Sequence, residues 1–152
     1  MQVYRLSSKD EVERILNTHS FEGLGKECTP NPKLNNHNYQ SNTRYIHFFK
    51  DFSSIFYLYP DENKFICTYD FPEEILSGTK GEGKYLDYLF FRNLQTTSEY
   101  AIPESDVNFS HLRQVSRINR ELEVEDYIAD KTLSTLTTPI YDATESSKAQ
   151  EK

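Results

Sequence analysis

The chain has 152 residues, which is enough for one domain with a hydrophobic core and too few for two ordinary domains. A net charge of -7 argues against the strongly basic surface that most nucleic-acid-binding domains present. The acidity is concentrated in residues 121–152, which hold eight acidic and three basic residues. The rest of the chain is therefore nearly neutral, and its charge is compatible with a local basic groove.

Membrane and metal functions are not indicated either. No apolar run approaches the roughly 18 residues of a membrane span, and the N-terminus lacks the apolar core of a signal peptide. We therefore expect a cytoplasmic protein without a membrane partner, although non-classical export would leave no signal. Cys28 and Cys67 lie far apart with no C-x-x-C motif, which predicts neither a metal site nor a disulfide; Cys67 is expected in the core.

The first predicted elements are a short strand and a helix. Residues 2–6 have the character of a strand, and Ser8-Lys9-Asp10-Glu11 has the form of a capping box, which predicts a helix over about 9–17. This order puts Arg5 at the end of its strand. The polar stretch 18–43 shows no sustained period, and so long a loop favours a lid or binding segment about as much as a surface meander.

The middle of the chain predicts alternating short strands and helices. Residues 44–49 read as a strand, followed by a short helix with Asp51 as its N-cap. A turn at 60–63 leads to a strand over 64–70, and the proline and acids of 71–76 suit the first turn of a helix.

Glycines and aromatic residues mark the next predicted loop and strand. Gly78, Gly81 and Gly83 precede an aromatic strand over 84–91. Their spacing does not match the phosphate-binding loop, so a turn is predicted there.

The stretch 97–107 places a carboxylate on a strand. Alternation puts Tyr100 and Ile102 on one face and Glu99 and Ala101 on the other. The following apolar residues recur at helical spacing and predict a helix over about 109–122, with the basic series Arg113, Arg117 and Arg120 solvating its other faces or contacting phosphates.

The C-terminal part is predicted to extend beyond the domain. Residues 1–122 are expected to form a single globular α+β domain and 123–141 a C-terminal extension, in which 123–136 is either a helix or an extended arm. The small polar residues of 142–152 predict a disordered tail.

Three blocks in this order resemble the motifs of the ADP-ribosyltransferase-like superfamily. They are Tyr4-Arg5-Leu6-Ser7, Tyr45-Ile46-His47-Phe48-Phe49 and the Glu99 block with its Pro103. The second and third look most like those of DNA-targeting ADP-ribosyltransferase toxins. The resemblance implies an α+β fold of small mixed or antiparallel sheets with a few short helices, arranged as a split β-sandwich with an NAD-type cleft.

The resemblance also implies roles for individual residues. Glu99 would be the catalytic residue, because a carboxylate stabilises the oxocarbenium-like ribose that forms when nicotinamide leaves NAD. The implied NAD-binding residues are Arg5, Ser7, Tyr45, His47, Phe48 and Phe49. A guanidinium suits a pyrophosphate or ribose, and aromatic rings suit nicotinamide, although only one face of the second strand can supply such a ring.

The chain departs from the superfamily pattern at two places. His47-Phe48-Phe49 stands where many transferases have Ser-Thr-Ser, and Thr97 stands where arginine-specific members have a further Glu or Gln. The acceptor of ADP-ribose is therefore left as protein, nucleic acid or water.

Two non-enzymatic hypotheses stay open. One is a non-catalytic member of the same fold. The other is an unrelated small acidic α+β interaction module, for which Arg5, His47 and Glu99 are not expected to converge.

Overall fold

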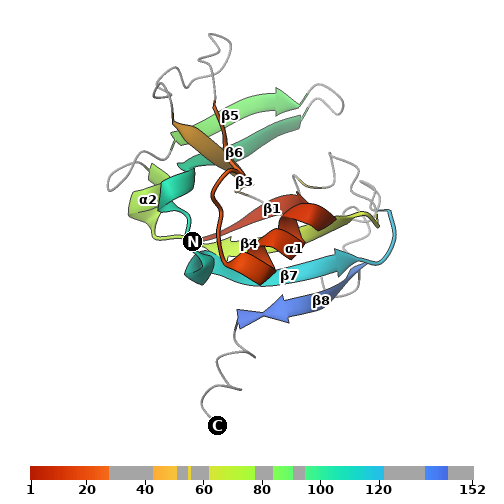
Figure 1. Ribbon diagram of the computed structural model, residues 1–152. Coiled ribbons are helices and arrows are strands. Elements are labelled where there is room, and N and C mark those ends of the chain that lie inside the picture. The colour runs from red at the N-terminus through yellow and green to blue at the C-terminus, as the bar shows by residue number, and fades with distance from the viewer. Residues whose placement is uncertain are drawn as a thin grey trace.

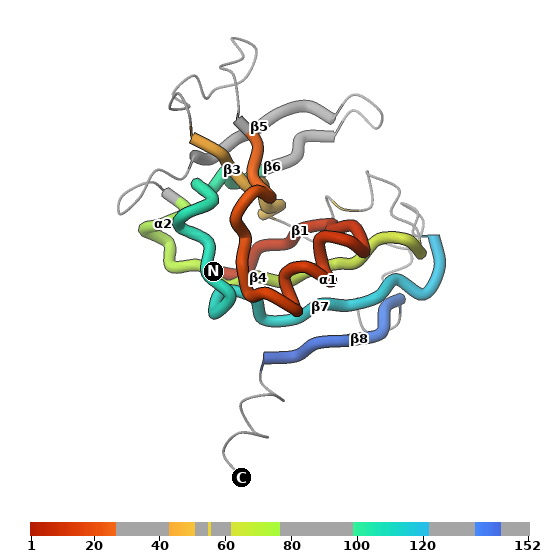
Figure 2. Tube along the Cα trace, viewed as in Figure 1, coloured from red at the N-terminus to blue at the C-terminus, as the bar shows by residue number. Residues whose placement is uncertain are grey.

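One antiparallel sheet organises the described part of the chain (Figure 1). The computed structural model describes residues 1–27, 43–50, 55, 62–77, 84–90, 95–121 and 136–143, and for Glu27, Ser77, 84–90 and 95–98 it describes the backbone alone. Figure 2 shows the chain path from the N-terminus, in the middle of the domain, to the strand nearest the C-terminus at its edge.

The described strands and helices are short. The strands are β1 Gln2–Ser8, β2 Lys26–Glu27, β3 Arg44–Phe49, β4 Lys64–Asp70, β5 Lys84–Phe90, β6 Gln95–Pro103, β7 Leu112–Ile118 and β8 Thr137–Asp142. The helices are α1 Lys9–Thr18, α2 Glu73–Ser77 and the 3-10 turns η2 Glu104–Asp106 and η3 Phe109–His111. The predicted α+β class, with an antiparallel sheet and few short helices, is confirmed.

The sheet is nearly divided between β1 and β3. Its order is β5-β6-β3-β1-β4-β7-β8, with β2 added on β3. β1 pairs with β4 over its whole length, from Gln2 to Ser8, but its register with β3 consists of the single pair Tyr4 and Phe49. In Figure 1 the strands β3, β5 and β6 accordingly stand apart from β1, β4 and β7.

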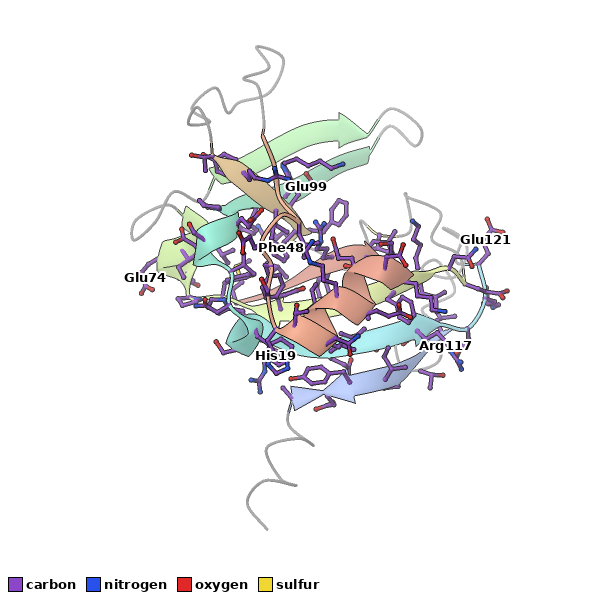
Figure 3. The ribbon with its side chains drawn as sticks, in the orientation of Figure 1. His19, Phe48, Glu74, Glu99, Arg117 and Glu121 are labelled. Carbon is purple, nitrogen blue, oxygen red and sulfur yellow. The ribbon has the colours of Figure 1, made fainter. Side chains whose placement is uncertain are left out.

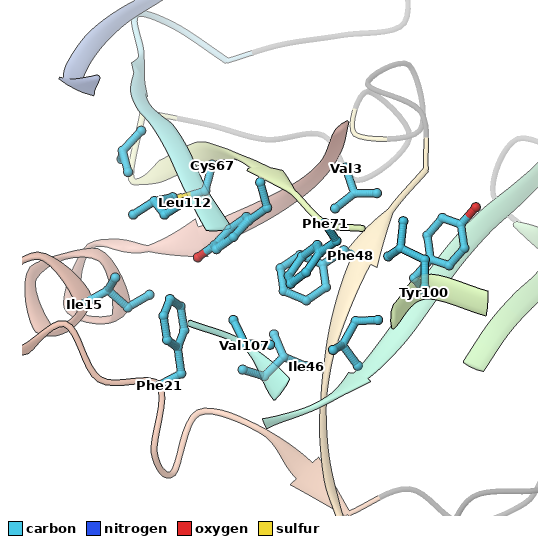
Figure 4. Packing of buried hydrophobic residues seen from close by; sticks show 14 of the residues in the cluster. Val3, Ile15, Phe21, Ile46, Phe48, Cys67, Phe71, Tyr100, Val107 and Leu112 are labelled. Atoms are coloured by element: carbon cyan, nitrogen blue, oxygen red, sulfur yellow. The ribbon is translucent and has the colours of Figure 1, made fainter. Parts of the chain in front are cut away.

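The main core lies on the face of the sheet that α1 covers (Figure 4). Phe48 is fully buried there, with its ring centroid 4.8 Å from that of Tyr69 and 5.0 Å from that of Phe71 in edge-on arrangements. Val12 and Ile15 of α1 pack into the same cluster. The abundance of Phe and Tyr in the sequence is thus used in the core, where edge-on rings add to burial.

A smaller cluster lies on the opposite face. It joins Phe49, Ile55, Ile66, Ile118 and Leu136, with Tyr4 and Leu6 packed against it. Phe48 and Phe49 are therefore core residues of two different faces, as alternation along a strand requires.

The first helix forms as its sequence predicts. Ser8 caps α1 and its hydroxyl accepts a hydrogen bond from the Glu11 amide at 3.2 Å. The strands predicted over 2–6, 44–49, 64–70 and around Glu99 are confirmed as β1, β3, β4 and β6. The strand predicted over 84–91 is confirmed as β5 for Lys84–Phe90, and Phe91 lies outside the described residues.

The helix predicted over 109–122 is wrong. Phe109–His111 is a 3-10 turn, and Leu112–Ile118 is strand β7. The pairing of β4 with β7 shifts between Thr68 and Tyr69, because Thr68 faces Gln114 but Tyr69 faces Leu112. This bulge inserts one extra residue, so Leu112 and Val115 reach the same core face at a spacing of three, which imitates a helical pattern.

The C-terminal extension contributes a strand. β8 pairs with β7 at the edge of the sheet, and Asp142 is its last residue. Residues 122–135 and 144–152, Asp51 with most of the helix predicted after it, the predicted turn with its three glycines and residues 28–42 lie outside the described residues.

The burial of Phe48 predicts a stability effect that a surface ring would not show. Phe48→Ala is expected to lower the free energy of unfolding by about 3 to 5 kcal/mol, because it leaves a cavity beside Tyr69 and Phe71. Urea unfolding followed by circular dichroism measures this. A loss below about 1 kcal/mol would show that Phe48 is not a central core residue.

Candidate functional site

Glu99 lies on a face of β6 opposite the main core. Tyr100 and Ile102 belong to the main core cluster, which confirms the predicted alternation. The Cα partner of Glu99 on β3 is Phe49, so the two side chains share a face. Rigid backbone hydrogen-bonded on both sides, by β3 and β5, therefore positions the carboxylate.

His47 meets this carboxylate from the neighbouring strand β3. Figure 3 labels Glu99 among the strands that stand apart from α1. Its Nδ1 lies 3.3 Å from Oε2 of Glu99, and the two side chains are 32% and 14% exposed. His47 is two residues from Phe49 on β3, which puts it on the face of Glu99. With a hydrogen on Nδ1, the imidazole donates to Oε2, while Oε1 has no partner among the described residues.

Arg5 connects β1, α1 and β3. Its Nε and Nη2 donate to the two carboxylate oxygens of Glu11 at 3.0 and 2.7 Å, and its Nη1 donates to the backbone carbonyl of His47 at 2.9 Å. Arg5 is not at a strand end, as the sequence suggested, but in the middle of β1 with α1 over it. Its guanidinium lies at the place where β1 and β3 stop pairing.

The pair of Arg5 and Glu11 is electrostatically coupled. Burial alone would lower the pKa of Arg5, but the hydrogen bond and charge of Glu11 outweigh it and raise that pKa. Burial likewise tends to raise the pKa of Glu11, and Arg5 outweighs it, so the pKa of Glu11 is lowered. Both groups are therefore charged at neutral pH.

The structure brings some predicted site residues together and separates others. Arg5 binds the backbone carbonyl of His47 from the α1 face of the sheet, whereas the imidazole of His47 and the carboxylate of Glu99 meet on the opposite face. The hypothesis of an unrelated interaction module expects such a separation of Arg5 from Glu99. Tyr45 and Phe49 share the face of Glu99 but are only 1% and 8% exposed.

Ser7 and Phe48 are placed elsewhere. Both are buried on the opposite face, the one covered by α1. Phe48 is therefore not a ring that stacks on a ligand beside Glu99. The hydroxyl of Ser7 lies beside Glu11 and Cys67, and it tends to lower the pKa of each.

Sequence reasoning missed the second role of Glu11. Glu11 was expected only as part of the capping box, but its carboxylate binds Arg5 instead of the backbone of Ser8. The sequence does contain a signal for this ion pair. When a helix follows a strand directly, an acidic residue at the third helical position lies close to a basic residue on that strand.

Glu104 anchors the first part of the predicted long loop to the end of β6. Its carboxylate oxygens accept hydrogen bonds from the amides of Gly23 and Gly25 at 2.6 and 2.8 Å. Arg44 of β3 donates to the Gly25 carbonyl at 2.7 Å. A Cβ on Gly25 would lie 2.8 Å from Oε2 of Glu104, so glycine is needed for this approach.

Two hollows of the described part lie away from Glu99. One, of about 390 Å³, is lined by the segments 19–22 and 104–109. The other, of about 420 Å³, lies over the polar ends of β1, β4, β7 and β8, where Tyr4, Thr68 and Asp142 are among its lining residues. Neither hollow includes Arg5, His47 or Glu99.

The described ranges indicate neither a metal site, nor a thiol nucleophile, nor a membrane-spanning helix. They contain no group of three or more His, Cys, Asp or Glu side chains that could hold a metal ion. Burial raises the pKa of Cys67 to about 12, so this core thiol stays protonated and is no nucleophile. Of the helices that the structure describes, none has the length and apolar character to cross a membrane.

The coupling of Arg5 and Glu11 predicts a pH-dependent stability. Because the pKa of Glu11 is lowered in the folded state, its contribution is fully present above its ordinary pKa of 4.5 and is lost as pH falls through the lower folded value. Glu11→Ala is expected to cost about 3 kcal/mol at pH 7, since it leaves Arg5 without its carboxylate.

The free energy of unfolding in urea, measured at pH 7 and at pH 3, tests this expectation. The difference between wild type and Glu11→Ala should shrink at the lower pH. An equal difference at both pH values would contradict the assigned ion pair.

Comparison with known proteins identifies no relative: no family model matches the chain, and neither a curated protein nor a solved structure is significantly similar to it.

Proposed function

We propose that the protein binds NAD and transfers its ADP-ribose to an acceptor or to water, using an ADP-ribosyltransferase-like split sheet. The observation that carries this proposal is the Glu99 carboxylate, held by His47 at 3.3 Å on a shared face of β3 and β6. The division of the sheet between β1 and β3, beside this face, also supports it.

The geometry suits glycosyl transfer. In that reaction the bond between the ribose C1′ and the nicotinamide nitrogen breaks, and its electron pair goes to the nicotinamide ring, which becomes neutral. The ribose carries oxocarbenium character, which a fixed carboxylate stabilises. The acceptor oxygen or nitrogen then bonds to C1′ and loses its proton to the carboxylate or to water.

His47 has a distinct task in this proposal. A single hydrogen bond to Oε2 orients Glu99 and leaves Oε1 for the ribose, since Oε1 has no partner among the described residues. The exposure of His47, 32% against 14% for Glu99, places the imidazole nearer to solvent. The ligand would approach from that side.

A non-catalytic member of the same fold is the second candidate. It is favoured by the environment of Arg5, since three of its five N–H groups already donate to Glu11 and to the His47 carbonyl. The burial of Ser7 and Phe48 on the other face also leaves the predicted NAD site without two of its members. Such a protein would bind a nucleotide or a partner without turnover.

Nicotinamide release from NAD distinguishes the two candidates. Wild-type protein with cell extract as the acceptor source is expected to release nicotinamide, and Glu99→Gln to reduce the rate by about 10²- to 10³-fold, because the amide cannot stabilise the positive ribose. Chromatography of the released nicotinamide provides the measurement.

Glu73→Gln is the matched control, because Glu73 is an exposed acid on α2, and it should release nicotinamide like wild type. If wild type releases none while NAD still raises the melting temperature, the protein binds without reacting. If NAD has neither effect, the proposed function is wrong.

A further inference from the structure

We infer that Arg5 and Glu11 are positioning residues that hold His47, and through it Glu99, in place. This inference rests on the proposed function and changes the role of Arg5, which the sequence resemblance assigned to NAD. A chain of contacts connects α1, through Arg5 and β3, to the Glu99 carboxylate.

The first step is the missing strand pairing at the seam, the place where β1 and β3 diverge. Tyr4 pairs with Phe49, and continuing that antiparallel register would put Leu6 opposite His47, but β1 and β3 form no such pair. The His47 carbonyl instead accepts a hydrogen bond from Nη1 of Arg5 at 2.9 Å. The guanidinium thus replaces a backbone donor where the two halves of the sheet separate.

The second step is the rigidity of the guanidinium itself. Glu11 binds Nε and Nη2 at once, which fixes the plane of the group as well as its position. The side chains of Arg5 and Glu11 are only 20% and 11% exposed, so water replaces these contacts poorly.

The third step connects Glu11 to the core. Glu11 lies in the first turn of α1, and the next residue, Val12, is buried in the main core cluster. The carboxylate is therefore held by a helix that is docked on the sheet. The position of the His47 backbone depends on that docking.

The last step is from the His47 backbone to its ring. A shift of this backbone moves the imidazole that lies 3.3 Å from Glu99. Displacements of about 1 Å in such sites reduce rates strongly, by up to about 10²-fold. Loss of Glu11 should therefore lower kcat, whereas loss of a direct NAD contact would raise KM.

Glu11→Gln and Arg5→Lys test this inference in the nicotinamide-release assay. Both are expected to lower kcat by about tenfold or more with little change in KM for NAD. The amide of Gln lacks the charge and second acceptor that Arg5 needs, and Lys cannot bridge Glu11 and His47 with a planar group. The double variant should be no worse than either single one, because all three break the same chain.

Glu13→Gln is the matched control on the same helix. Glu13 is exposed and its only described ion pair is the 3.9 Å contact with Lys9, so its kinetics should equal those of wild type. A raised KM with unchanged kcat in Arg5→Lys would overturn the inference and return Arg5 to the NAD site. Equal kinetics of Glu11→Gln and Glu13→Gln would also overturn it.

A second readout does not depend on turnover. In NMR spectra, Glu11→Gln is expected to move the ring proton signals of His47 and the carbonyl carbon signal of His47, and Glu13→Gln to leave both unchanged. Unmoved His47 signals in Glu11→Gln contradict the inference. If these signals move but wild type releases no nicotinamide, the positioning network stands and the proposed function fails.

Discussion

The Arg5 guanidinium is the interaction on which the arrangement of β1, α1 and β3 depends. A cation on the core face of a sheet is costly unless a carboxylate and further acceptors surround it. Glu11 supplies the carboxylate from the first turn of α1, which begins directly after β1. The His47 carbonyl supplies the other acceptor, so the same cation also spans the gap in the sheet.

Most of the fold is predictable because its signals are local. Strands such as β3 and β4 are short apolar and aromatic runs, and the Ser8 cap of α1 is encoded within four residues. β7 is different, because its helical spacing results from a bulge that depends on the register with β4. A register between strands more than 40 residues apart cannot be read from either strand alone.

The face of the sheet on which each proposed site residue lies was only partly predictable. Alternation says that Phe48 and Phe49 face opposite sides, yet it does not say which side carries the core, because both are apolar and both faces are covered. Glu99 was easier, since it alternates with Tyr100 and Ile102, whose apolar side chains fix the core face of the strand. Glu11 fits two sequence patterns, a capping box with Ser8 and an ion pair with Arg5. The capping box is local and was predicted, whereas the longer-range ion pair was not.

The two halves of the sheet carry different charged and polar groups. The half with β1, β4 and β7 carries α1 and the partly buried ion pair of Arg5 and Glu11, while the half with β3 and β6 carries His47 and Glu99. Because backbone pairing between the halves is limited to Tyr4 and Phe49, the hydrogen bond from Arg5 to His47 adds a second constraint on their relative position. The carboxylate of Glu99 needs such a constraint, since strand pairing fixes its backbone and, of the residues that the structure describes, His47 alone binds its side chain. The chemistry proposed for Glu99 therefore depends on how firmly α1 is docked on the other half of the sheet.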